Sequence, residues 1–285
     1  MNSKYSTCPF INRSVLFRII SILYFGFVPE SSAEDYVFFT FAGTGGVSGS
    51  EDGKPGKFSN PWGIAIDTTK NIYVSEPESS TIRKISPDGL VSTLAGLSGQ
   101  GGALDGVGSG ARFGYPTGIA TDQSGNVYVA DTRNSVIRKI TPSGVVSVYA
   151  GGMLQPGFVD GPAVNARFLL PAGLTMDRAG NLWVCELGGR IRIIGTDQVV
   201  TSLSSTYRLS GFITADAGGN MFVSCLDHTV RKNFNIFAGG IVGFVDGNGV
   251  GARFNQPRGL AVDSGGNLLV VDSYNSLIRQ ISPSG

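Results

Sequence analysis

The chain has 285 residues, of which 22 are lysine or arginine and 21 are aspartate or glutamate, and its one histidine is His228. This balance provides no basic field for a phosphate backbone, so nucleic acid is excluded as the expected partner. A single histidine also excludes a multi-histidine zinc site, and it confines any Ser-His-Asp arrangement to His228.

Residues 1–33 have the pattern of a secretory signal peptide. Basic residues precede an apolar run at 19–28, and a Ser-Ser-Ala sequence ending at Ala33 is typical of a cleavage site. The apolar run is too short to span a bilayer, which needs ~20 residues. An uncleaved anchor that begins at Val15 is the alternative. We therefore expect a secreted, periplasmic or extracellular protein with no membrane span in its mature chain.

The rest of the chain, residues 34–285, contains five copies of one pattern. In each copy an aspartate is followed four residues later by an asparagine, and short β-prone runs flank the pair. A period of roughly 40 to 55 residues indicates stacked supersecondary units. The copies are expected at residues 58–96, 113–151, 168–203, 207–239 and 254–285.

The second copy shows what one unit contains. Its runs at 118–121, 127–130, 136–140 and 145–150 are rich in β-branched residues, and turn-forming residues separate them. Such runs are typical of hairpin-linked strands. No apolar stripe at helical spacing continues for three turns after the leader. The pattern therefore predicts an all-β fold, a β-propeller of five four-stranded blades.

Residues 36–43 are expected to complete the last blade. The fifth copy ends after three strands, whereas 36–43 form an unassigned strand ending in the Ala-Gly that also ends strand four in three copies. We expect this strand to pair with residues 277–282 and to close the ring without a free inner edge. Six blades in a longer protein is the alternative.

The motifs Pro-x-Gly-Ile/Leu, Gly-Asn-Val/Leu and Asn-Ser-x-Ile-Arg closely resemble those of the NHL-repeat family, and the match extends over residues 58–285. The resemblance implies a β-propeller that serves as an interaction module, and the loops between copies are similar to those of secreted or cell-surface members. In the fourth copy Ser210 stands in place of proline and Gly211 comes one residue early, so we expect a distorted blade. A fold by itself assigns no function.

Each copy has an acidic residue after its second strand and an arginine in its third. A ring of carboxylates on one rim could bind a cation, but repetition in every blade favours structural pairs between strands two and three, or turn caps. The acids are Glu76, Asp131, Glu186, Asp227 and Asp272, and the arginines are Arg83, Arg138, Arg192, Arg231 and Arg279.

Several loops contain Asp-Gly, which suggests a calcium site, most clearly at Asp246. The twelfth position of an EF-hand loop starting there is Pro257 instead of glutamate, so we interpret these pairs as turns. We predict no cofactor or metal, with Ca²⁺ as the alternative.

Candidate contact residues are those where the repeat is broken. The residue between proline and glycine before strand one is Trp62 in the first copy and Arg258 in the last. With Tyr115 and Tyr274 on nearby loops, these residues predict a partly aromatic rim, since Trp and Arg are frequent anchors of recognition sites. The alternative is that Trp62 packs between blades.

Cys185 and Cys225 lie in the second strands of adjacent copies, offset by one residue. The offset turns their side chains to opposite strand faces, and sheets pack ~10 Å apart, beyond the usual reach of a disulfide. We expect two buried thiols, with a disulfide as the alternative.

These observations together predict a monomeric, non-catalytic binding module that engages a protein, peptide or glycan through its loop-rich rim. The alternative is a hydrolase of the lactonase or strictosidine-synthase type, whose folds resemble this one. Such an enzyme would need a metal or a catalytic residue in the central channel.

Overall fold

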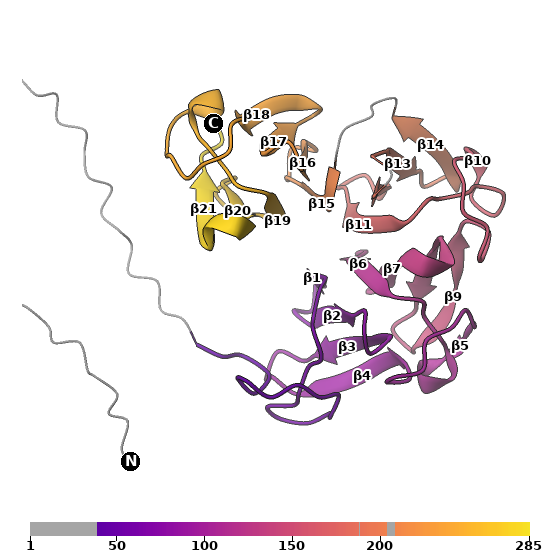
Figure 1. Cartoon of the computed structure of the whole chain (residues 1–285). Helices are drawn as coiled ribbons and strands as arrows, with labels where there is room; N and C mark the ends of the chain where they lie inside the picture. The colour runs from indigo at the N-terminus through magenta and orange to yellow at the C-terminus, as the bar shows by residue number, and fades with distance from the viewer. Residues whose placement is uncertain (1–38, 188, 204–208) are drawn as a thin grey trace, which may run out of the picture. The chain divides into compact units, whose positions relative to one another are not determined.

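The β-prone runs form strands that pair antiparallel with their neighbours along the chain. The computed structural model describes residues 39–187, 189–203 and 209–285, and its strands make five successive sheets (Figure 1). The first strands of all five sheets line a common channel. The predicted all-β, five-bladed β-propeller is confirmed.

Each blade follows the chain from the channel outward. Blade 1 consists of β1 (Ile64–Ile66), β2 (Ile72–Glu76), β3 (Thr81–Ile85) and β4 (Val91–Gly96). Blade 2 consists of β6 (Pro116–Thr121), β7 (Val127–Asp131), β8 (Val136–Ile140) and β9 (Val145–Ala150). Blade 3 consists of β11 (Pro171–Met176), β12 (Leu182–Glu186), β13 (Ile191–Ile194) and β14 (Val199–Leu203).

Blades 4 and 5 continue the same order. Blade 4 consists of β15 (Leu209–Ala215), β16 (Met221–Cys225), β17 (Thr229–Lys232) and β18 (Asn235–Gly239), and blade 5 of β19 (Pro257–Val262), β20 (Leu268–Asp272) and β21 (Leu277–Ile281). The short strands β5 (Gly106–Val107) and β10 (Gly161–Pro162) extend the outer edges of blades 2 and 3. Short 3-10 turns are η1 (Gly108–Gly110), η2 (Thr132–Asn134), η3 (Gly249–Gly251) and η4 (Ser273–Asn275).

The repeated aspartate and asparagine make the turn between strands one and two. In blade 2, Asp122 Oδ1 accepts the backbone N–H of Asn126 at 2.9 Å, and its Oδ2 accepts the Asn126 side-chain amide at 2.8 Å. At the equivalent Asp67, burial raises the carboxyl pKa, but bonds from Asn71 and its neighbours outweigh burial and lower the pKa to about 2. The interval is therefore fixed because one side chain closes the turn of each hairpin.

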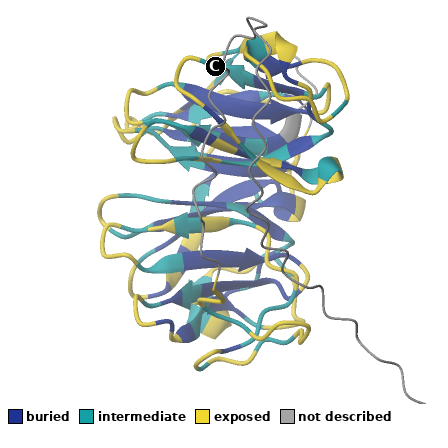
Figure 2. Ribbon diagram, turned by 90° about the vertical axis from the view of Figure 1, so that its left-hand side faces the viewer, coloured by how far each residue is buried: buried dark blue, intermediate teal, exposed yellow. Residues whose placement is uncertain are grey.

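Neighbouring blades pack face to face through alternate residues of their strands. Tyr73 and Ile82 of blade 1 lie against Ile119 and Val129 of blade 2, and Phe113 of the connecting loop completes the cluster. All five side chains are buried. In Figure 2 the buried strands form the interior of the stacked sheets, and the exposed residues gather in turns and loops. Full burial of such a side chain stabilises the fold by roughly 1.5–3 kcal/mol.

The predicted closure of the last blade by the N-terminal strand is wrong for the described residues. Blade 5 has three strands, and residues 39–43 form no strand, while 36–38 lie outside the described residues. Ala42 and Phe58 instead pack on blade 1, and the Gly43 N–H donates to the Pro55 carbonyl at 2.8 Å. The reason is that blade 1 has its own exposed face, and the segment preceding it is the nearest chain to cover that face.

The two cysteines are unbridged and buried, as expected. They nevertheless share one cluster, in which Ile191 of blade 3 and Ile213 of blade 4 also lie. The one-residue offset does place the thiols on opposite faces of their own sheets, but those two faces meet at the same junction. Burial raises the pKa of both thiols, which disfavours the reactive thiolate.

Within the residues that the structure describes, no helix is long and apolar enough to cross a bilayer. The expected signal peptide, residues 1–33, lies outside them.

Candidate functional site

The rim acids form buried ion pairs within their own blades. Asp131 Oδ2 lies 3.1 Å from Nη1 of Arg138, and both side chains are fully buried. Asp131 also accepts the Gly114 N–H at 2.6 Å, and Arg138 donates to the Arg112 carbonyl at 3.2 Å. These contacts hold the backbone on both sides of Phe113, over whose ring the guanidinium carbon of Arg138 lies at 5.2 Å.

The same arrangement recurs in blades 1, 3 and 5. Its acid–arginine pairs are Glu76–Arg83, Glu186–Arg192 and Asp272–Arg279. Its aromatic rings belong to Phe58, Phe168 and Phe254. In blade 4, Asp227 pairs with Arg231 at 3.0 Å. Since Glu76, Asp131, Glu186 and Asp272 are buried and paired, they do not present a ring of free carboxylates to solvent.

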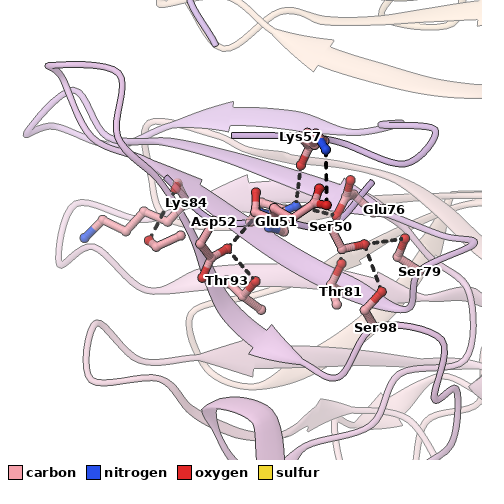
Figure 3. A network of polar contacts seen from close by, with 12 residues as sticks. Ser50, Glu51, Asp52, Lys57, Glu76, Ser79, Thr81, Lys84, Thr93 and Ser98 are labelled. Atoms are coloured by element: carbon pink, nitrogen blue, oxygen red, sulfur yellow. Dashed lines mark hydrogen bonds and ion pairs between the residues drawn. The ribbon is translucent and has the colours of Figure 1, made fainter. Parts of the chain in front are cut away.

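The Asp-Gly loops have a role that the sequence interpretation missed. Asp105 Oδ1 accepts a bond from Nη2 of Arg138 at 2.6 Å, so this arginine is held between two acids, as are its equivalents in blades 1, 3 and 5. Figure 3 shows the blade 1 version, in which Asp52 also accepts a bond from Thr93. The available signal was spacing, because the loop aspartate precedes the arginine by 31 to 33 residues in four blades.

Glu186 is the least satisfied of these acids. Blade 2 has Asn134, which donates to Asp131 at 2.8 Å, whereas a leucine and glycines occupy the corresponding turn of blade 3. Oε2 of Glu186 is buried without a hydrogen-bond partner among the described residues. Burial raises the pKa of this carboxyl to about 7, despite the opposing bond from Leu169 and the charge of Arg192.

The raised pKa of Glu186 predicts a pH dependence of stability. The folded state retains a proton that the unfolded state releases near pH 4.5, so this contribution is complete below that pH and is lost as pH rises through about 7. Glu186→Gln removes it. We expect the variant to gain about 2 kcal/mol relative to the wild type between about pH 5 and about pH 8, measured by urea unfolding. Parallel pH profiles for the two proteins would contradict this assignment.

The mouth of the central channel is an apolar hollow. A cavity of about 140 Å³ is lined by one glycine from each of the five blades and by aliphatic and aromatic side chains. None of its lining residues is ionisable. They include Trp62, Ile64, Ile119, Leu174, Phe212 and Leu260.

Trp62 is half-exposed and stacks on Phe212 of blade 4, with ring centroids 6.2 Å apart and planes inclined by 18°. Phe212 occupies the place of the repeat's glycine because Gly211 comes one residue early and adopts a φ of +88°. Four residues of β15 oppose two of β16 at this point, so the distortion expected for blade 4 is present. The one-residue shift was the sequence signal for Phe212, although it was interpreted only as a distortion.

The other predicted contact residues do not join Trp62 in this cavity. Tyr115 packs against Arg133 of its own blade, with the guanidinium carbon 4.5 Å from the ring centroid. Arg258 directly precedes a channel-lining glycine, and its carbonyl accepts a bond from Ser224 at 2.8 Å. Tyr274 is exposed on the turn after β20. The predicted rim is therefore spread over separate blades.

A second hollow, of about 410 Å³, lies where the turns between strands one and two of blades 1 to 4 meet. It contains Asp122, Asp177 and Asp216, but each of these carboxylates accepts bonds from the asparagine of its own turn. In the described part of the chain no group of three or more His, Cys, Asp or Glu side chains is placed to hold a metal ion.

Comparison with known proteins finds one repeat family and several relatives. The NHL repeat family profile matches residues 113–140 and 254–281. SUPPRESSOR OF QUENCHING 1, a chloroplastic protein of Arabidopsis thaliana, is 30% identical over 64% of this chain, which covers 18% of that protein. NHL repeat-containing protein 2 of Gallus gallus is 28% identical over 83% of this chain, which covers 33% of its length.

The chain thus spans a third or less of these two relatives. Among solved structures, one from a nidogen/laminin complex aligns with a TM-score of 0.56 and 17% identity, covering 78% of this chain and 75% of that one. At this identity the likeness concerns the fold alone.

Proposed function

Because this chain belongs to the NHL-repeat family of β-propellers, we propose that it is a non-catalytic binding module, which engages a protein, peptide or glycan through the loop-rich end of its channel. The observation that carries the proposal is the channel mouth, where Trp62 and Phe212 stack over a cavity without ionisable side chains. A half-exposed aromatic pair offers apolar area to a ligand at a low cost in side-chain entropy.

The hydrolase alternative receives no support from the channel lining. General acid–base or metal-assisted chemistry needs ionisable or ligating side chains that reach the substrate. The carboxylates nearest the opposite mouth, such as Asp177, are engaged by donors of their own turns, and these donors outweigh burial and lower its pKa.

We propose in addition that the protein is exported. The leader expected at residues 1–33 would deliver the propeller to the extracellular or periplasmic space, where a protein or glycan ligand would be met. This location remains a prediction from the sequence.

A binding experiment with Trp62→Ala tests the module. We would probe arrays of extracellular-protein peptides and of glycans with labelled protein, and then measure the affinity of the strongest ligand. Removing the indole should weaken binding by about 30-fold, as expected for a central aromatic anchor, while the melting temperature stays unchanged. Val164→Ala is the matched control, because Val164 is an exposed apolar residue that does not line the cavity. Equal affinity of wild type and Trp62→Ala would remove the channel mouth from the binding site.

A further inference from the structure

An apolar strip continues the channel mouth onto blade 3. Leu187, which follows β12, lies beside the mouth, because a Cβ on Gly211 would be 3.0 Å from its Cδ2 atom and Phe212 is the next residue. The Leu187 N–H donates to the Leu170 carbonyl at 3.1 Å, so the two leucines are neighbours. Leu187 is 49% exposed and Leu170 is 40% exposed. Together with Trp62 and Phe212, the two leucines form what we call the blade 3 strip.

The same two positions are occupied differently in blades 1, 2 and 5. Leu170 precedes the proline of strand one, and Leu187 follows the buried acid of strand two. The equivalent residues are Asn60 and Pro77 in blade 1, Tyr115 and Thr132 in blade 2, and Gln256 and Ser273 in blade 5. The repeat thus folds without leucine at either position. Exposed leucines that the fold does not require indicate a surface for binding.

A guanidinium without a carboxylate partner lies in the same turn as Leu187. The turn is closed by a bond of 2.9 Å from the Glu186 N–H to the Arg190 carbonyl. The guanidinium carbon of Arg190 lies 4.0 Å from the centroid of the Phe158 ring. Among the described residues no ion pair involves Arg190, whereas the nearby Arg192 is paired with two acids. Stacking uses the face of the Arg190 guanidinium and leaves its N–H edge for an anionic partner.

The chemistry of this surface favours a peptide over a glycan. A sugar brings hydroxyl groups that need hydrogen bonds when they leave water, and the side chains of Leu170, Leu187 and Phe212 supply none. Apolar side chains of a peptide do not carry this cost. A carboxylate beside them would meet the guanidinium of Arg190 in a charge-assisted hydrogen bond.

We propose that the ligand of the channel mouth is a protein segment in which apolar side chains adjoin an acidic one. This inference rests on the proposed function and narrows it. The apolar side chains contact Trp62, Phe212 and Leu187, and the carboxylate binds Arg190. Charge complementarity with the unpaired guanidinium selects this occupant, and it places the acidic residue over the turn of Leu187 and Arg190.

Three labelled peptides test the class of ligand. Each has the same apolar core, Leu-Phe-Leu, flanked on both sides by glutamate, by glutamine or by lysine. In fluorescence polarisation the wild type should bind the glutamate peptide about 10-fold more tightly than the lysine peptide. Arg190→Gln should remove this preference. Leu187→Ser should weaken the binding of all three peptides by about 10-fold, because it removes apolar contact area and leaves the charge in place.

Arg178→Gln is the matched control for the charge. Arg178 is also exposed and without an ion pair among the described residues, but it lines the hollow at the opposite mouth. This variant should keep the wild-type preference. A wild type that does not prefer the glutamate peptide overturns the inference, and so does a preference that survives Arg190→Gln.

The same experiment separates this inference from the proposed function. If no peptide binds at millimolar concentration while an arrayed glycan is captured by the wild type and lost in Trp62→Ala, the ligand class is wrong and the binding module stands. If neither peptides nor glycans bind, the proposed function fails together with the inference.

Discussion

Replacing Arg138 with alanine should lower the free energy of unfolding by about 3–5 kcal/mol. The guanidinium is fully buried between Asp131 and Asp105, and its removal leaves the Asp131 carboxylate without its countercharge in the interior. The contact with the Phe113 ring and the bond to the Leu104 carbonyl are lost as well. Urea unfolding followed by circular dichroism measures the change.

Two further variants grade this effect and keep it testable if Arg138→Ala does not fold. Asp105→Ala removes only the half-exposed one of the two acids that hold Arg138, and it should lower the free energy of unfolding by about 1–2 kcal/mol. Lys57→Ala removes an exposed pair with Glu51 and should leave the free energy of unfolding almost unchanged. Similar losses in all three variants would show that burial of the arginine is not what matters.

Gly118→Ala should destabilise the propeller by at least about 2 kcal/mol, whereas Gly259→Ala should cost less than about 1 kcal/mol. The two glycines hold the same place in their repeats, but a methyl group on Gly118 overlaps the Ala172 carbonyl of the next blade. On Gly259 the methyl group meets only the Val271 side chain of the same blade. Thermal unfolding of both variants provides the comparison.

Equal destabilisation by the two substitutions would indicate that blade 5 is packed forward as tightly as blade 2.

The strand pattern was predictable because local chemistry determines it. The turn formed by Asp122 and Asn126 and the alternation around Tyr128 are readable from adjacent residues. The acid–arginine pairing followed from a short interval, which is seven residues in three copies and shorter in the other two. The fate of residues 39–43 was not predictable in this way. A strand can pair with any free edge, and the sequence does not state which apolar face of the fold needs cover.

The candidate site was predictable in part. Trp62 was identified because it breaks the repeat, and it does line the channel mouth. Phe212 was missed because its effect depends on a one-residue shift in register, which moves a large ring to a place where the other blades have glycine. Tyr115 was expected at the same rim, but its ring packs on Arg133 of its own blade.

The arginines held between two acids also indicate where the duplicated segment of a repeat begins. Arg138 donates hydrogen bonds to the Asp105 side chain and to the Arg112 carbonyl, and both residues come before the first strand of blade 2. A duplicated segment that started at β6 would leave these partners behind, whereas one that ran from the end of β4 to the end of β9 would bring them along. Duplication or deletion of segments bounded by the ends of fourth strands would accordingly add or remove intact blades. The number of repeats in such a chain can therefore change while every arginine keeps its acidic partners.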